Sequence, residues 1–141
     1  MARVSKRHAT FTVDGTEYRS ECSKFEITVD ELDTDFLTFA DAEADAKKFI
    51  LAMTFAQDHA ADSLWTLMNT TYSAATPEVD VLYRPYGNAV ATATQPHVEG
   101  TVRVTLPSGT WMGGEADAST TAVNTVEVEW EFIAAPNLVT A

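Results

Sequence analysis

Residues 125–132 alternate strictly between polar and apolar side chains, and this pattern limits the possible folds more than any other in the chain. Successive side chains of an extended backbone point to opposite faces, so a period of two predicts a strand with one buried face. Val126, Val128, Trp130 and Phe132 form the apolar face, and Thr125, Glu127, Glu129 and Glu131 form the polar one. We expect a strand at 125–133 with three carboxylates on its polar face.

Similar signals recur along the chain. Twenty threonines and many valines favour extended backbone, because β-branched side chains pack well on a pleated surface. Asp14-Gly15 between 10–13 and 16–18 predicts a hairpin turn. Further strands are expected at 24–29, with Phe25, Ile27 and Val29 on the buried face; at 47–55, with Phe49, Leu51, Met53 and Phe55 on one side; at 79–83; and at 98–106, with Val102, Val104 and Leu106 together.

One amphipathic helix is expected after the second long strand. Asp58 is a suitable cap, and apolar residues follow at three- and four-residue spacing: Ala60, Ala61, Leu64, Leu67 and Met68, with Trp65 at the edge of the stripe. We expect Leu64, Trp65, Leu67 and Met68 to cover a sheet and to share one helix–sheet core with Val126, Val128, Trp130 and Phe132. The fold class predicted is mainly β, a β-sandwich or partly closed barrel with one flanking α-helix, in a single domain over residues 1–141.

Two charged segments interrupt this pattern. Residues 1–8 form a basic arm that carries Arg3, Lys6 and Arg7. Residues 30–46 are predicted to form an acidic loop or protruding hairpin, in which Phe36-Leu37-Thr38-Phe39 makes a short strand or a hydrophobic tip. The acidic residues are Asp30, Glu31, Asp33, Asp35, Asp41, Glu43 and Asp45.

The charge balance excludes some classes of protein. A formal net charge of −12 disfavours binding to duplex nucleic acid or anionic lipid, which both need a cationic surface. Cys22 is the only cysteine, so no intramolecular disulfide forms and a free, buried thiol is expected. No secretion signal or membrane span is expected, because no apolar run is long enough.

Catalytic and metal-binding motifs are not expected. His8, His59 and His97 occur in unrelated contexts, and Cys22 lacks a family signature. Asp41, Glu43 and Asp45 alternate as calcium ligands do, but Ala46 replaces the required glycine, which favours a solvated acidic face. We therefore predict no catalytic residues, no cofactor and no metal.

Several stretches resemble the major tail proteins of long-tailed bacteriophages, which form the tail tube. These are LYRPYGN at 82–88, ATATQPHVEGTV at 91–102, GGEAD at 113–117, VEVEWEF at 126–132 and PNLVTA at 136–141. The resemblance is most specific over residues 64–141. Residues 1–63 match in style only, and the acidic segment matches no family motif.

The resemblance implies a structural virion protein and not an enzyme. Such a protein would be made in the bacterial cytoplasm and would assemble into hexameric rings that stack into a tube for genome ejection. Its partners would be further copies of itself and the tape-measure, tail-terminator and tail-tip proteins. DNA would pass through without specific binding, and a lumen of carboxylates would let it slide. We expect Glu127, Glu129 and Glu131 to line that lumen; an ordinary solvent-facing sheet surface is the alternative.

Contacts between subunits must offset the repulsion between acidic rings. We hypothesise that Arg3, Lys6 and Arg7 reach the acidic segment of an adjacent subunit or ring; a frayed, solvated arm is the alternative. Two other functions remain open. One is a single-ring tail terminator or head–tail connector, and the other is a monomeric carbohydrate-binding module that stacks sugars on Trp111, Tyr86 and Tyr83.

Overall fold

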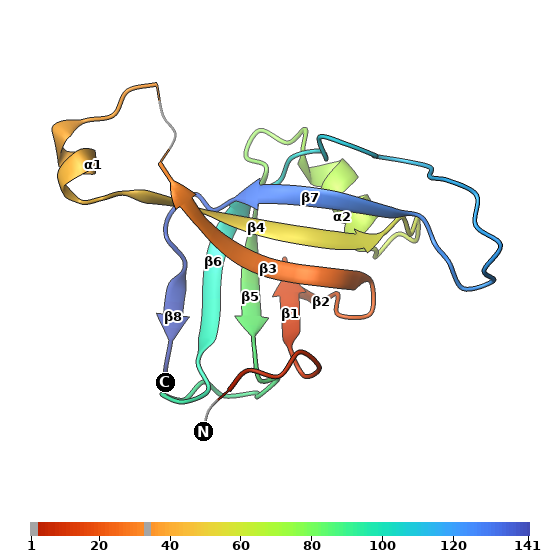
Figure 1. The fold of residues 1–141 in the computed structure, drawn as a ribbon, viewed down its shortest axis with the longest axis horizontal. Coiled ribbons are helices and arrows are strands. Elements are labelled where there is room, and N and C mark those ends of the chain that lie inside the picture. The colour runs from red at the N-terminus through yellow and green to blue at the C-terminus, as the bar shows by residue number, and fades with distance from the viewer. Residues whose placement is uncertain (1–2, 33–34) are drawn as a thin grey trace.

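The computed structural model describes residues 3–32 and 35–141, which form two antiparallel sheets packed face to face (Figure 1). One sheet has the order β2-β1-β5-β6-β8, with strands Thr16–Glu17, Thr10–Val13, Glu78–Arg84, His97–Arg103 and Asn137–Val139. The other has the order β3-β4-β7, with strands Cys22–Glu31, Lys47–Ala56 and Thr125–Glu131. The fold is a mainly β sandwich with a flanking helix, and the described chain does not close into a barrel.

The core lies where the strands of one sheet cross those of the other. Leu51, Met53 and Phe55 point into it from β4, as the alternation predicted. The apolar face of β7 and the residue after it are buried as well, at Val126, Val128, Trp130 and Phe132. Transfer of these side chains out of water is the main contribution to the stability of the sandwich.

The hairpin predicted at Asp14-Gly15 is present. Asp14 has φ 53° and Gly15 has φ 80°, so both turn residues are left-handed, as a two-residue hairpin turn requires. The turn joins β1 to β2, and Val13 pairs with Thr16 across it.

The flanking helix α2 (Leu64–Thr71) begins later than predicted. Ser63 is its N-cap and accepts a hydrogen bond from the Thr66 amide, whereas Asp58 accepts one from the Ala60 amide in the preceding loop. Asp58 was therefore wrong as the cap, because its side chain closes a local turn instead. Leu64 and Met68 are buried as expected; Trp65 and Leu67 are only partly buried against the core.

The prediction for β3 was partly wrong. Phe25 and Ile27 are half-buried against the core, but Val29 is 57% exposed. Val29 lies near the end of β3, which is an edge strand with a neighbouring strand on one side only.

The acidic segment projects from the sandwich between β3 and β4, as a loop with a one-turn helix, α1 (Phe39–Glu43) (Figure 1). This helix was not predicted, and the alternative of a short strand at residues 36–39 was wrong. A capping box starts the helix: Thr38 accepts from the Asp41 amide, and Asp41 accepts from the Thr38 amide. Phe36, Leu37 and Phe39 stay largely exposed, which agrees with a hydrophobic tip.

The end of one strand and the presence of another also differ from the prediction in the C-terminal half. Strand β6 ends at Arg103, so Leu106 lies in a loop and is part-exposed, while Val104 remains buried. The short strand β8 was missed, because three residues carry too little periodicity to detect. It forms one edge of the larger sheet.

Candidate functional site

The two sheets differ in their edges. The larger sheet ends in β2 and β8, which have two and three residues. The smaller sheet ends in β3 and β7, with ten and seven residues, and within the described chain no strand pairs along the outer side of either. Directly after β7, Phe132 forms an isolated bridge to Val102 of β6, and the Ile133 amide donates to the Thr101 carbonyl at 3.0 Å. A long unpaired edge exposes a row of backbone donors and acceptors, and proteins normally shorten or cover such edges. The edges of β3 and β7 are therefore candidate assembly surfaces.

The hydrogen-bonding pattern between β4 and β7 shows which amides of β7 face its open edge. The Phe132 amide donates to the Phe49 carbonyl at 2.9 Å, which places the even-numbered amides of β7 toward β4. The amides of Glu127, Glu129 and Glu131 therefore point to the open edge. The loop at 108–110 lies beside part of β7 and encloses a depression of about 360 Å³ with Glu127 and Glu129. Within the described residues it makes no backbone hydrogen bond to the strand.

The polar face of the smaller sheet is mainly acidic. Glu127, Glu129 and Glu131 all lie on it and are exposed, so the structure brings these predicted residues onto one surface. They are opposite Thr54, Ala52 and Ile50 of β4, and beyond these lie the β3 residues Lys24, Glu26 and Thr28. Asp30 and Lys48 continue the face. The face thus has five carboxylates and two ammonium groups.

The basic arm lies at the Cys22 end of β3. The Arg19 guanidinium donates to the Arg7 carbonyl at 2.8 Å and ties the arm to the body of the protein. The side chains of Arg3, Lys6 and Arg7 are exposed. Cys22 nearby is half-buried, and burial, reinforced by Glu21 and Glu17, raises the pKa of its thiol to about 12. The thiol is therefore protonated at neutral pH and is a poor nucleophile.

The acidic segment has internal partners for some of its charges. The Lys47 ammonium lies 2.6 Å from a Glu31 carboxylate oxygen and 3.1 Å from one of Asp45. Its hydrogen bond to Glu31, and to a smaller extent the one to Asp45, raises the pKa of Lys47 above its ordinary value. Asp30 accepts from the Glu31 amide.

The remaining acidic residues differ in their surroundings. Asp41 caps α1, whereas Asp35 and Glu43 are exposed and have no hydrogen bond or ion pair within the part of the chain that the structure describes. Asp33 lies outside the described residues.

The arm and the acidic segment do not meet in one copy. Ten residues of β3 separate them, which is about 30 Å of extended chain. A contact between the two would therefore have to join two copies head to tail.

The three aromatic residues considered for sugar stacking are not together. Tyr83 packs on Phe25 at 5.0 Å between ring centroids, whereas Trp111 lies 5.6 Å from Trp65 beside α2. The Trp111 indole donates to Asn69 at 2.8 Å, and the Trp65 indole donates to the Trp111 carbonyl at 3.1 Å. This pairing was not predicted. It pins the glycine-rich loop to the helix and uses both indole N–H groups internally.

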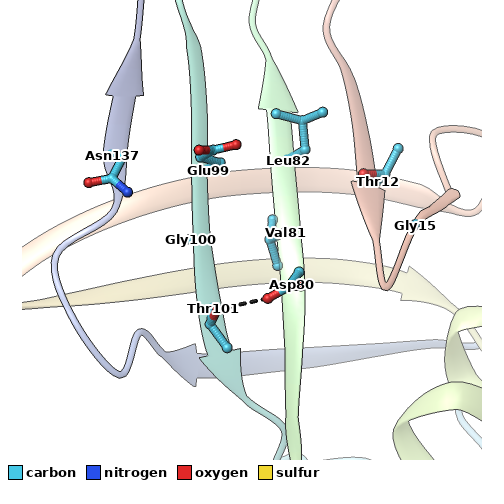
Figure 2. A pocket seen from close by; sticks show the side chains of 9 residues that line it. All are labelled: Thr12, Gly15, Asp80, Val81, Leu82, Glu99, Gly100, Thr101 and Asn137. Carbon is cyan, nitrogen blue, oxygen red and sulfur yellow. Dashed lines mark hydrogen bonds between the residues drawn. The ribbon is translucent and has the colours of Figure 1, made fainter.

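His59 and His97 lie in different surroundings. His97 is buried, with Nε2 2.9 Å from the Asn88 carbonyl oxygen, whereas the His59 ring lies tilted against Trp65 with 4.4 Å between ring centroids. A depression of about 470 Å³ lies over the outer face of the larger sheet (Figure 2). Its Asp80 carboxylate accepts from the Thr101 hydroxyl at 2.8 Å. Among residues 3–32 and 35–141, no three His, Cys, Asp or Glu side chains are grouped to hold a metal ion.

The chain was compared with models of known protein families and with curated proteins. Neither comparison finds a match. In the described part of the chain, no helix has the length and apolar character needed to cross a bilayer.

Proposed function

We propose that this chain is a phage tail-tube subunit: a structural virion protein whose copies pair edge to edge in hexameric rings, which stack into a hollow tube for genome ejection. The observation that carries the proposal is the pair of long, unpaired edges on the three-stranded sheet. The motifs in residues 64–141 that resemble tail-tube proteins support it.

The number of strands favours a ring over a two-fold dimer. In a sheet of three antiparallel strands the two outer strands, β3 and β7, run parallel to each other. If β7 of one copy pairs with β3 of the next, each copy is related to its neighbour by the same rotation. When successive rotations return to the first copy, this head-to-tail contact makes a closed ring. Pairing β3 with β3 would leave β7 unpaired in every copy.

The acidic face of the same sheet suits a channel for DNA. Its opposite face is the core, so in a closed ring the carboxylates would face either the lumen or the outside. Duplex DNA carries one charge about every 1.7 Å, and a cationic wall would hold it by counterion release. A lumen that carries Glu127, Glu129 and Glu131 would repel DNA and let it slide.

Assembly of the purified full chain tests the proposal. We expect six-fold rings and hollow rods in negative-stain images as the concentration rises. A monomer at every concentration would refute it. Rings that never stack would instead support a single-ring terminator or connector.

The pairing edge is tested by Glu129→Pro. This change removes an amide that faces the open edge and leaves the hydrogen bonds to β4 intact. We expect a folded monomer by circular dichroism and sedimentation. Glu129→Thr removes the same charge but keeps the amide, so it should still assemble. Assembly of the proline variant like the wild type would rule out this edge.

A further inference from the structure

We propose that rings are joined by insertion of the acidic segment of one copy into a basic groove beneath the arm of a second copy. The inference rests on the proposed function and adds the contact between rings. It follows from two surfaces at opposite ends of β3 that match in both charge and apolar character.

The groove has a volume of about 470 Å³ and lies between the arm and the start of β3. Its floor is aromatic: Phe11 stacks on Phe25 at 4.1 Å, and Phe25 stacks on Tyr83 at 5.0 Å. Four of the nine Lys and Arg residues of the chain line it: Lys6, Arg7, Arg19 and Lys24. Among the described residues, no Asp or Glu lines it. This is a concentration of positive charge on a chain of net charge −12.

Internal contacts build the groove before any partner arrives. The Arg19 guanidinium holds the Arg7 carbonyl, and the Arg19 amide donates to Glu17 at 2.9 Å. Lys24 lies 3.6 Å from Glu26. Within the described chain the side chains of Lys6 and Arg7 have no ion-pair partner. Two cationic side chains are thus available at the rim.

The acidic segment presents the complementary surface. Phe39 is 96% exposed and Leu37 is 55% exposed, so two apolar side chains stand in water at the end of a projecting loop. The capping box at Thr38 and Asp41 fixes this turn. Glu43 and Asp35 flank it with unpaired carboxylates. Insertion of Phe39 over the aromatic floor would remove apolar surface from water while Glu43 meets the cations at the rim.

The direction of the contact assigns it to stacking. Strands pair perpendicular to their length, so edge pairing of β3 with β7 extends the assembly sideways. The groove and the acidic segment lie at the two ends of β3, so their contact extends the assembly along the strands. Edge pairing thus makes rings, and the second contact joins one ring to the next.

Two variants and their mixture test the inference. The first variant is Phe39→Ser with Glu43→Lys, and the second is Lys6→Glu with Arg7→Glu. All four side chains are exposed, and Arg7 keeps its backbone contact with Arg19. Val90→Ser with Glu115→Lys is the matched control, because it makes the same kinds of change at exposed sites elsewhere.

We expect each test variant to form single rings without rods, and the control to form rods. A mixture of the two preformed ring variants should yield double rings that grow no further, because one has intact grooves and the other intact acidic segments. Wild-type rods should separate into rings at about 1 M salt, where the screening length falls to about 3 Å.

Rods formed by either test variant, or no double rings in the mixture, would overturn the inference and leave the proposed function standing. The wild type could instead form linear end-to-end assemblies without rings. If both variants abolished those assemblies, the result would support the contact and refute the ring. Wild-type protein that stays monomeric would refute both.

Discussion

The indole Nε1 of Trp130 donates a hydrogen bond to the Thr105 carbonyl at 2.9 Å from within the core. The ring is fully buried, so the bond satisfies a polar group that water cannot reach. It also ties the loop after β6 to β7. The contact joins the two sheets through a side chain that the sequence pattern had placed on the apolar face, beside the backbone bridge between Val102 and Phe132.

Substitutions at Trp130 should separate packing from hydrogen bonding. Trp130→Ala should lower the free energy of unfolding by about 3–5 kcal/mol through the cavity that it leaves. Trp130→Phe should lower it by about 1–3 kcal/mol, partly because the Thr105 carbonyl loses its donor. Urea unfolding measures both. Equal losses for the two variants would contradict the packing contribution, and an unchanged free energy in Trp130→Phe would contradict a role for the hydrogen bond.

Gly100 should tolerate no side chain while Phe132 keeps its ring. A Cβ at position 100 would lie 2.8 Å from a ring carbon of Phe132 and 3.3 Å from the Pro136 Cα. We expect Gly100→Ala to cost about 1–3 kcal/mol through overpacking. The cost should fall in a Phe132→Leu background, and a double-mutant cycle measures that difference. An unchanged cost would show that the ring is not the obstacle.

The observed start of α2 predicts unequal effects of two cap substitutions. Ser63→Ala should cost about 1 kcal/mol, because the Thr66 amide loses its acceptor. Asp58→Ala should cost at most about 0.5 kcal/mol, since Asp58 acts only in an exposed loop. Thermal unfolding of the two variants compares them. A larger loss of stability for Asp58→Ala than for Ser63→Ala would instead support Asp58 as the helix cap, as predicted from the sequence.

The thiol of Cys22 should be slow to alkylate and should couple stability to alkaline pH. With its pKa raised from 9.0 to about 12, the thiolate fraction at pH 8 falls by roughly three orders of magnitude, and alkylation by iodoacetamide should slow accordingly. Because the pKa is higher in the folded state, the thiol stabilises the fold below pH 9, and this contribution is lost as the pH rises from 9 toward 12.

Cys22→Ala isolates that contribution from other alkaline titrations, since burial also raises the pKa of Tyr18 and Tyr83. The difference in unfolding free energy between wild type and variant should change over this pH range. A difference that stays constant from pH 8 to 11 would contradict the shift.

Charge reversal on the acidic face tests the lumen. Tubes that carry Glu127→Lys, Glu129→Lys and Glu131→Lys should retain double-stranded DNA at about 0.15 M salt and release it at about 1 M. The matched triple glutamine variant removes the charge without reversing it and should retain little. Lysine tubes that pass DNA as freely as the wild type would place these residues outside the lumen.

The sequence by itself determined what local periodicity controls. The alternation at 125–132 defined both faces of β7, and Asp14-Gly15 defined a turn, because Asp and Gly tolerate the left-handed conformations that this turn requires. Only the tertiary structure decided which surfaces are covered. Val29 shares the alternation of Phe25 and Ile27 but lies near the end of an edge strand, and it is exposed.

Long-range packing also decided which distant residues form a surface. Arg19 and Lys24 belong to no basic run, yet the fold places them beside the arm around one groove. Trp111 contacts Trp65 across 46 residues of sequence. No periodicity encodes such contacts, because they arise from how the sheets cross and where the loops return.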